Sequence, residues 1–190
     1  MGYMVPVGVS NRHMHLSEED LNTLFGAGYE LQPAKDLKQP GQYAAEEKVD
    51  VVGPKGTLKG VRVLGPLRSA TQVELSFTDA RMLGVELPVK ESGKLDDTPG
   101  IELVGPAGTV RIEQGAIAAL RHVHLSPEQA AEAGVRDKQM VRLRVPGERG
   151  LTFDNVLVRS GEGHEKEVHL DTDEANAAGL KNGMEVEILA

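Results

Sequence analysis

Two histidine pairs, each separated by a single residue, stand out in this chain of 190 residues. They lie in the phrases RHMHLS (residues 12–17) and RHVHLS (residues 121–126), which together hold four of the six histidines. In an extended strand, residues two apart point to the same face and lie about 6.6 Å apart at Cα. The two histidines of each phrase would therefore share one face of a strand.

Histidines placed in this way can bind a metal ion together. Neutral imidazole is a favoured ligand of Zn²⁺, with zinc–nitrogen bonds of about 2.0–2.1 Å. The alternative is that they are solvated strand residues opposite an apolar face, which a single H-x-H pair would favour. Because the pair occurs twice, we expect His13 with His15, and His122 with His124, to be metal ligands.

A third repeat extends the histidine pattern. VHLSPEQAAEAG (123–134) aligns without a gap to VHLDTDEANAAG (168–179), so His169 occupies the place of His124. Each of the three copies, including the one that begins with RHMHLS, predicts a strand, a helix N-cap, a short helix and a terminal glycine. The expected caps are Ser17, Ser126 and Asp171, and the expected terminal glycines are Gly28, Gly134 and Gly179.

The rest of the chain is rich in short β-forming runs separated by Gly and Pro turns, which is typical of small barrels or sandwiches. VGPKGTL (52–58) and VGPAGTV (104–110) are interpreted as one hairpin turn used twice. Strands are predicted at Val49–Val52, Gly60–Leu64, Val73–Phe77, Ile101–Val104, Met140–Val145, Val156–Arg159 and Met184–Leu189.

Residues 65–79, GPLRSATQVELSFTD, combine an arginine with a strand-like alternation. From Gln72 to Phe77 polar and apolar residues alternate, which predicts a half-buried strand whose polar face carries Glu74. Arg68 precedes it at a turn. Taken alone, both residues also fit an ordinary solvated surface.

Composition excludes several classes of protein. A formal net charge of -8 without basic clusters, and only 3% aromatic residues, disfavour nucleic-acid binding. The absence of cysteine excludes disulfides, thiolate zinc sites and a cysteine nucleophile. The first residues lack the pattern of a signal peptide, so we expect a soluble, cytoplasmic protein. His164, in the polar segment SGEGHEKE, is predicted to be solvated.

The motifs in this order resemble the PduL-type phosphotransacylase family, the phosphate propanoyltransferases, which exchange the acyl group of acyl-CoA with inorganic phosphate. The resemblance runs from GVSNRHMHLS through GPLRSATQVELSFTDARMLG and RHVHLS to EVHLDTDEANAAGL. It implies a mainly β chain with short capping helices, arranged as two small closed β-barrels with the active site between them.

The resemblance also implies how the chain is divided. Residues 1–11 plus 120–190 would form one barrel, with the first strand joined to the C-terminal half. Residues 12–119 would form the other, with a helical or loop excursion at about 17–47. Family members targeted to bacterial microcompartments carry an N-terminal extension before the first strand. Because this sequence begins almost at that strand, the cytoplasm is the expected location and the microcompartment lumen is disfavoured.

Carried onto matching positions, the family's site gives each residue a role. Two zinc ions per chain are implied, and Arg68 would be the catalytic residue that binds phosphate. The implied zinc ligands are His13, His15 and Glu74 for one ion, and His122, His124 and His169 for the other. The implied coenzyme A contacts are Gly8, Val9, Ser10, Lys55, Arg62, Arg159 and Asn176.

The expected activity is a zinc-dependent acyltransferase acting on short-chain acyl-CoA, either propanoyl-CoA or acetyl-CoA, to give acyl phosphate and CoA. With no cysteine and no G-x-S-x-G phrase, direct attack by phosphate is favoured over an acyl-enzyme. The resemblance further implies a homodimer, and an acetate or propionate kinase in the same pathway. Two alternatives stay open: a zinc-dependent thioester or ester hydrolase, and a non-catalytic metal-binding module.

Overall fold

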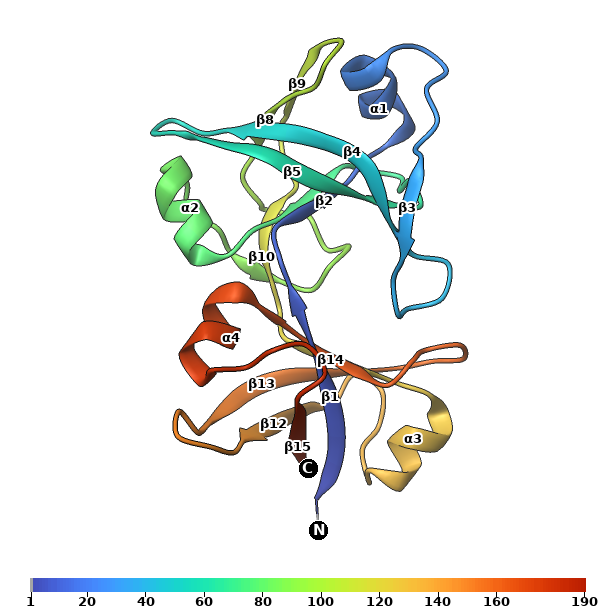
Figure 1. The fold of residues 1–190 in the computed structure, drawn as a ribbon, viewed down its shortest axis with the longest axis vertical. Coiled ribbons are helices and arrows are strands. Elements are labelled where there is room, and N and C mark those ends of the chain that lie inside the picture. Colours follow the sequence, from blue (N-terminus) through green and yellow to red (C-terminus); the bar gives the residue numbers. More distant parts are fainter. Residues whose placement is uncertain (1) are drawn as a thin grey trace. The chain divides into compact units, whose positions relative to one another are not determined.

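The computed structural model describes residues 2–190, and Figure 1 shows the order of its helices and strands. The chain divides into two compact units: Met1–Asn11 with Leu120–Ala190, and Arg12–Ala119. Each unit has its own β-sheet and its own apolar core. The longest helix in residues 2–190 has eight residues, and no helix there could span a membrane.

The unit that contains both ends of the chain is built on a closed barrel. Its six strands pair in the order β1-β14-β11-β13-β12-β15, and β15 pairs with β1 to close the ring. The elements are β1 (Tyr3–Ser10), β11 (His122–Leu125), α3 (Pro127–Glu132), β12 (Met140–Val145), β13 (Leu151–Ser160), β14 (Glu167–Asp171), α4 (Thr172–Ala178) and β15 (Glu185–Leu189). Strand β12 illustrates the pattern of a barrel strand. Its residues Val141, Leu143 and Val145 are buried inside the barrel and alternate with exposed residues on the outer face.

The second unit is built on a nine-stranded sheet. Its strands follow the order β7-β10-β6-β2-β5-β4-β8-β9, with β3 paired to β4. The elements are β2 (His13–His15), α1 (Glu18–Phe25), β3 (Pro33–Asp36), β4 (Tyr43–Val52), β5 (Thr57–Gly65), β6 (Gln72–Glu74), α2 (Phe77–Leu83), β7 (Val89–Lys90), β8 (Ile101–Val104), β9 (Thr109–Ile112) and β10 (Ala116–Ala119).

The mainly β class with short helices is confirmed, although only one of the two sheets is a closed barrel. The nine-stranded sheet is a curled half-barrel. It is open, since within the described residues no ladder joins its end strands β7 and β9. The predicted excursion at 17–47 contains α1, β3 and the beginning of β4, so it is less irregular than expected.

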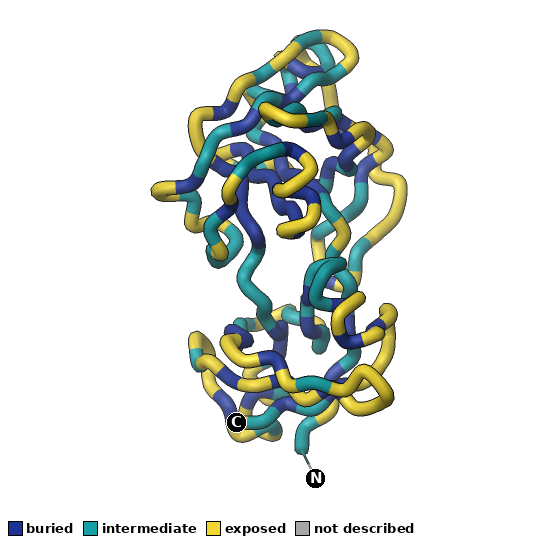
Figure 2. Tube along the Cα trace, turned by 90° about the vertical axis from the view of Figure 1, so that its left-hand side faces the viewer, coloured by how far each residue is buried: buried dark blue, intermediate teal, exposed yellow. Residues whose placement is uncertain are grey.

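The core of each unit contains the apolar residues that alternate with the histidines. Met14 and Leu16 are fully buried in one core, and Val123 and Leu125 in the other. Figure 2 shows buried residues inside each unit and exposed ones mainly on the outer parts of the chain. This burial anchors the histidine strands from their apolar side.

Most of the predicted strands are present, with small differences at their ends. Ile101–Val104 and Met140–Val145 coincide with β8 and β12. The other confirmed runs lie in β4, β5, β13 and β15.

The predicted strand Val73–Phe77 is wrong over its second half. Strand β6 ends at Glu74, and helix α2 begins at Phe77 after the N-cap Ser76. Phe77 is 53% exposed instead of buried, and all three β6 residues are buried, including its polar ones. A capping box at Ser76 and Asp79 starts the helix and ends the alternation.

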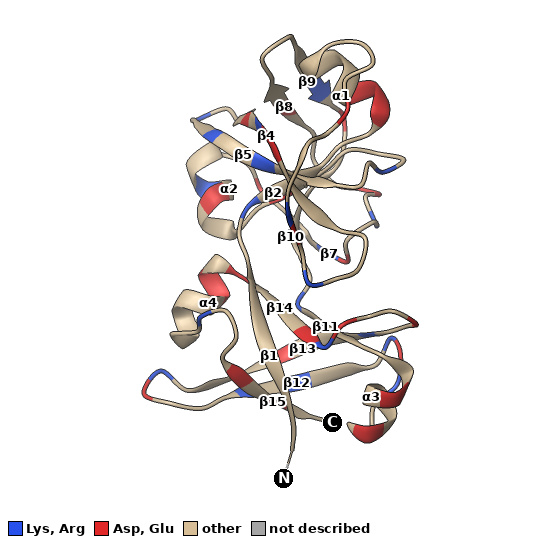
Figure 3. Ribbon diagram, turned by 45° about the vertical axis from the view of Figure 1, so that its right-hand side comes forward, with Lys and Arg blue, Asp and Glu red and all other residues tan. Residues whose placement is uncertain are grey.

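Three helices begin directly after the predicted N-caps Ser17, Ser126 and Asp171, and each of these side chains accepts a hydrogen bond from a backbone N–H. Acidic residues in the first turns, coloured red on the ribbon of α1 and α4 in Figure 3, suit the positive end of the helix dipole. The C-terminal glycine is confirmed for α4, at Gly179. Helix α1 is capped by Gly26 instead of Gly28, and α3 by Ala133, one residue before Gly134.

The repeated phrase VGP-x-G forms two hairpin tips that cover helix ends. In the β4–β5 tip, the backbone N–H of Lys55 donates to Leu83 O at the end of α2, at 2.9 Å. In the β8–β9 tip, Ala107 N–H donates to Leu24 O near the end of α1, also at 2.9 Å. The first glycine of each phrase allows this close approach. A Cβ built on Gly105 would lie 2.4 Å from Leu24 O.

We expect Gly105→Ala to destabilise the Arg12–Ala119 unit by about 1–3 kcal/mol, because the new methyl group meets a backbone carbonyl that cannot move easily. Urea unfolding would measure the effect. The matched control is Ala107→Ser, an exposed position in the same tip that keeps its N–H; it should change stability by less than about 0.5 kcal/mol. Equal stability of the two variants would show that the tip is not held tightly against α1.

Candidate metal centres

The first group of possible metal ligands is brought together by the antiparallel pairing of β2 with β6. This register places His13 opposite Glu74. The distance from His13 Nε2 to Glu74 Oε2 is 3.5 Å, and the rings of His13 and His15 are 5.3 Å apart. One ligand atom from each of these three residues lies within 4.8 Å of the others, so a single ion could bind all three.

The second group has the same construction in the other unit. Strands β11 and β14 pair antiparallel, with His122 opposite His169. The ring centroids of His122, His124 and His169 are 4.9–5.0 Å apart in all three pairs. Their ligand atoms also lie within 4.8 Å of one another. In both groups, therefore, the first histidine of the phrase faces the third ligand across a ladder.

Burial keeps the second histidine of each phrase uncharged. Desolvation, followed by the neighbouring His13, lowers the pKa of His15 to about 3. Desolvation, followed by His122, lowers the pKa of His124 to about 2. Both side chains are therefore neutral imidazoles at neutral pH, which is the form that binds a metal ion.

The hydrogen bonding of the imidazoles fits a metal as well. The buried Nδ1 atoms of His15 and His124 have no hydrogen-bond partner among the described residues, which is costly unless another ligand satisfies them. His122 contacts the Leu120 carbonyl through Nδ1, and His169 contacts the Glu167 carboxylate through Nε2, both at 2.8 Å. Metal-binding histidines typically use their second ring nitrogen in this way.

The sequence did not single out two residues that hold Glu74 in place. Gln72 Nε2 donates to Glu74 Oε1 at 2.6 Å, and Ser92 Oγ donates to the same oxygen at 3.0 Å. Glu74 is only 8% exposed, so the solvated alternative for this residue is wrong. Gln72, which was expected on a half-buried strand, is 1% exposed.

The strand and helix around Glu74 form a fourth copy of the histidine motif. When Glu74 is aligned with His169, the N-caps Ser76 and Asp171 coincide, and so do the left-handed C-caps Gly84 and Gly179. Glutamate replaces histidine and Phe77 follows the cap, which hid this copy. The sequence signal that remains is a leucine, a capping residue, an acid three residues later, and glycine at the end of the helix.

The arginine that opens each histidine phrase binds the helix of the opposite copy. Arg12 forms two contacts with Asp79, Nη2 to Oδ1 at 2.7 Å and Nε to Oδ2 at 3.1 Å. In the other unit, Arg121 Nε donates to Glu174 Oε1. Asp79 and Glu174 are the capping-box acids of α2 and α4. Each pair therefore ties a ligand strand to the helix that follows the third ligand.

Arg68 lies in the loop between β5 and β6, close to the first group. Its backbone N–H donates to Leu16 O at 2.9 Å, and its Nη1 donates to Ser92 Oγ at 3.1 Å. Its positive charge is one of the causes of the lowered pKa of His15. The residue pattern alone predicted a turn position for Arg68, and the family resemblance implied a phosphate-binding role. The structure places Arg68 beside Ser92, which contacts Glu74.

Most of the residues predicted to bind coenzyme A lie near the second group. Gly8 is opposite His169, Arg159 is opposite His124, and Asn176 lies on α4. Val9 and Ser10 complete the end of β1. A Cβ on Gly8 would meet the Glu167 carboxylate carbon at 2.7 Å, so this glycine allows close packing beside His169.

The two remaining coenzyme A residues belong to the Arg12–Ala119 unit. Arg62 is paired with His13 across β5 and β2, and its Nη1 donates to Ala45 O at 2.7 Å. Lys55 lies in the hairpin tip that covers α2, where its side chain contacts Gly84. The structure thus accounts for Lys55 by packing, and its coenzyme A role stays a prediction.

His164, expected to be solvated, is only partly exposed. Its ring lies 4.8 Å from that of His124, and its Nδ1 contacts Arg159 O at 3.0 Å. The loop between β13 and β14 folds back over the second ligand group, which the polar sequence of this loop did not reveal.

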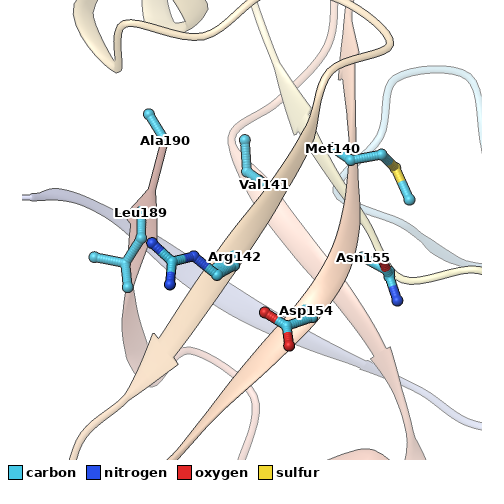
Figure 4. Close-up of a pocket in the computed structure, with 7 residues that line it drawn as sticks. All are labelled: Met140, Val141, Arg142, Asp154, Asn155, Leu189 and Ala190. Atoms are coloured by element: carbon cyan, nitrogen blue, oxygen red, sulfur yellow. The ribbon is translucent and has the colours of Figure 1, made fainter.

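An open pocket with a volume of about 360 Å³ lies elsewhere in the barrel unit, and Figure 4 shows its lining. It is formed by Met140, Val141, Arg142, Asp154, Asn155, Leu189 and Ala190. None of these residues belongs to either ligand group.

We expect Arg12→Ala to destabilise the protein by about 2–3 kcal/mol, because it leaves the fully buried carboxylate of Asp79 without its charged partner. Thermal and urea unfolding would measure this. The control is Arg144→Ala, since Arg144 is 66% exposed and lies 3.9 Å from Glu187; little change is expected there. A similar small effect in both variants would reduce the Arg12–Asp79 pair to an ordinary surface contact.

Known proteins resemble this chain along nearly its whole length. The family model described as phosphate propanoyltransferase matches residues 6–181. The phosphate propanoyltransferase of Thermotoga maritima is 58% identical over 178 residues, which cover 93% of this chain and 85% of that protein. That of Salmonella typhimurium is 52% identical, covering 94% and 85%, and that of Clostridioides difficile is 46% identical, covering 97% and 88%. The chain with these two matched ligand groups therefore belongs to the phosphate propanoyltransferase family and is an acyltransferase.

Proposed function

We propose that the protein is a zinc-dependent phosphate acyltransferase that converts a short-chain acyl-CoA and inorganic phosphate into acyl phosphate and CoA. The substrate would be propanoyl-CoA or acetyl-CoA. The observation that carries the proposal is the pair of ligand groups with equivalent strand registers, one of them beside Arg68. The family assignment provides the reaction class.

Each ligand group would hold one zinc ion. The donor sets, three imidazoles in one group and two imidazoles with a carboxylate in the other, are typical of catalytic zinc sites that keep a position for substrate. Bound there, zinc would supply Lewis-acid stabilisation of negative charge on oxygen and sulfur. The protein contributes neutral, buried imidazoles whose orientation is set by the ladders.

Arg68 would hold the phosphate nucleophile. A guanidinium group stays charged and can donate two parallel hydrogen bonds to phosphate oxygens. In the proposed reaction, a phosphate oxygen forms a bond to the thioester carbonyl carbon. The carbon–sulfur bond then breaks, and CoA leaves as a thiolate. With no cysteine and no G-x-S-x-G phrase in the chain, direct attack is favoured over a covalent acyl-enzyme.

The coenzyme A contacts remain part of this proposal. Gly8, Val9, Ser10, Arg159 and Asn176 lie in the unit of the second ligand group, and Lys55 and Arg62 in the unit of the first. We also propose a homodimer, and an acetate or propionate kinase as the enzyme that uses the acyl phosphate.

The deciding experiment measures CoA release from propanoyl-CoA and acetyl-CoA at increasing phosphate concentration, together with acyl phosphate formation. We expect release to depend on phosphate and to match acyl phosphate in amount. Thioester cleavage without phosphate would support the alternative, a zinc-dependent hydrolase. A non-catalytic metal-binding module is not supported, because the family is one of enzymes.

We expect about two zinc ions per chain, and Glu74→Gln should lose or weaken one of them and lower turnover steeply. The substitution keeps the volume of a nearly buried side chain but removes the charge that attracts the ion. Metal analysis and activity would be measured together. Glu46→Gln, an exposed change on β4, is the control and should keep both ions. Two ions and normal turnover in Glu74→Gln would contradict the role of Glu74.

Arg68→Ala should lower turnover by about 10²–10³-fold, since it removes a charged donor where negative charge develops. The free energy of unfolding should change by no more than about 0.5 kcal/mol, because Arg68 is a partly exposed loop residue. Arg68→Lys should restore little, because a point charge cannot replace the planar guanidinium. Phosphate dependence and zinc content would be measured for both variants.

The control for these variants is Arg81→Ala, an exposed arginine on α2. It should behave like the unchanged protein. The same phosphate dependence in the unchanged protein, Arg68→Ala and Arg68→Lys would contradict the proposed contact with phosphate.

A further inference from the structure

Ser92 connects Arg68 to Glu74 through hydrogen bonds. Arg68 Nη1 donates to Ser92 Oγ at 3.1 Å, and Ser92 Oγ donates to Glu74 Oε1 at 3.0 Å. A single hydroxyl thus contacts both the arginine assigned to phosphate and the carboxylate assigned to the first metal ion. Ser92 is distant from both in sequence, 24 residues after Arg68 and 18 after Glu74.

Gln72 completes this network and anchors Ser92. Its Nε2 donates to Glu74 Oε1 at 2.6 Å and to Ser92 Oγ at 2.8 Å, which uses both of its N–H groups. Its Oε1 accepts the backbone N–H of Gly93 at 2.8 Å. The loop that carries Ser92 is therefore tied to β6 by side-chain and backbone contacts.

The hydroxyl of Ser92 has the capacity that these contacts require. A serine hydroxyl can donate one hydrogen bond and accept two. Here it donates to Glu74 and accepts from Arg68 and Gln72. Three hydrogen bonds therefore fix the position of Ser92. Through two of them, Ser92 restricts the positions of the Arg68 and Glu74 side chains.

The hydrogen bonds of this network involve one carboxylate oxygen of Glu74, and the other oxygen faces His13. Oε1 accepts from Gln72 and Ser92, whereas Oε2 lies 3.5 Å from His13 Nε2. Hydrogen bonds to one oxygen of a carboxylate ligand orient the other oxygen toward the metal. The same contacts limit the rotation of the Glu74 side chain.

The second ligand group uses a different arrangement at the equivalent position. In the aligned copies Gln72 corresponds to Glu167, and Glu167 contacts its own candidate ligand, His169 Nε2, at 2.8 Å. A residue two positions before the third ligand thus orients that ligand in both units. In the first group, a serine also connects the third ligand to an arginine.

We propose that Ser92 is a positioning residue that sets the geometry between the metal-binding carboxylate of Glu74 and the phosphate-binding guanidinium of Arg68. This inference rests on the proposed function for its phosphate part. Ser92 would act through these two partners and need not contact substrate itself. Binding of an ion at Glu74 and binding of phosphate at Arg68 would then share one hydroxyl group.

The test compares Ser92→Ala with Ser92→Thr, which keeps the hydroxyl. We expect Ser92→Ala to raise the KM for phosphate about tenfold, because Arg68 loses a hydrogen-bond partner. The KM for acyl-CoA should change much less. One of the two zinc ions should bind about tenfold to a hundredfold more weakly in competition with a chelator. Ser92→Thr should restore both values to within about threefold.

Two controls separate positioning from a general structural role. Ser69→Ala removes an exposed hydroxyl next to Arg68 and should leave the phosphate KM and zinc affinity unchanged. In the double variant Arg68→Ala with Ser92→Ala, the phosphate KM should equal that of Arg68→Ala alone, since Ser92 acts through Arg68. Fully additive effects would overturn this part of the proposal.

The outcomes also distinguish this proposal from the proposed function. If the unchanged protein shows no phosphate-dependent turnover, the proposed function and the phosphate part of the Ser92 proposal both fail. Zinc competition then still tests the link to Glu74. If Ser92→Ala lowers only the melting temperature and leaves phosphate KM and zinc affinity as they were, the positioning role of Ser92 is overturned.

Discussion

The antiparallel pairing of ligand strands is the constraint on which both candidate metal centres depend. In one unit it sets His13 against Glu74, and in the other His122 against His169. A shift of the register by one residue would turn every ligand to the opposite face of the sheet. The fully buried Met14 and Val123 oppose such a shift, because their side chains would leave the core.

Contacts between the ligand strands and the neighbouring helices support this register. Arg12 and Arg121 reach the capping-box acids of the opposite copies, so helix caps and ligand strands hold one another. The hairpin tips cover the ends of α1 and α2. Burial lowers the pKa of His15 and His124, so that the same packing that fixes their position also keeps them ready to bind a metal ion.

The two units reuse one motif. Four copies of a strand followed by a capped helix supply the six candidate ligands, and glutamate replaces histidine in one copy. In the first group, Ser92 connects Arg68 to the candidate ligand Glu74.

Much of the local structure was predictable from the sequence. The N-caps Ser17, Ser126 and Asp171 are confirmed, because a cap depends on residues within one helical turn. The shared face of each histidine pair follows from strand periodicity alone. By contrast, the end of β6 at Glu74 was missed, since a capping box overrode an alternation that ran on to Phe77.

The sequence by itself determined which residue types could bind metal, where the short helices begin, and which apolar residues alternate with the histidines. Only the tertiary structure decided that Gln72 and Ser92 hold Glu74, that Arg12 and Arg121 bind distant helices, and that His164 packs on His124. The physical reason is range. Caps and periodicity act within a few residues, whereas these contacts join segments whose approach depends on strand order and loop packing.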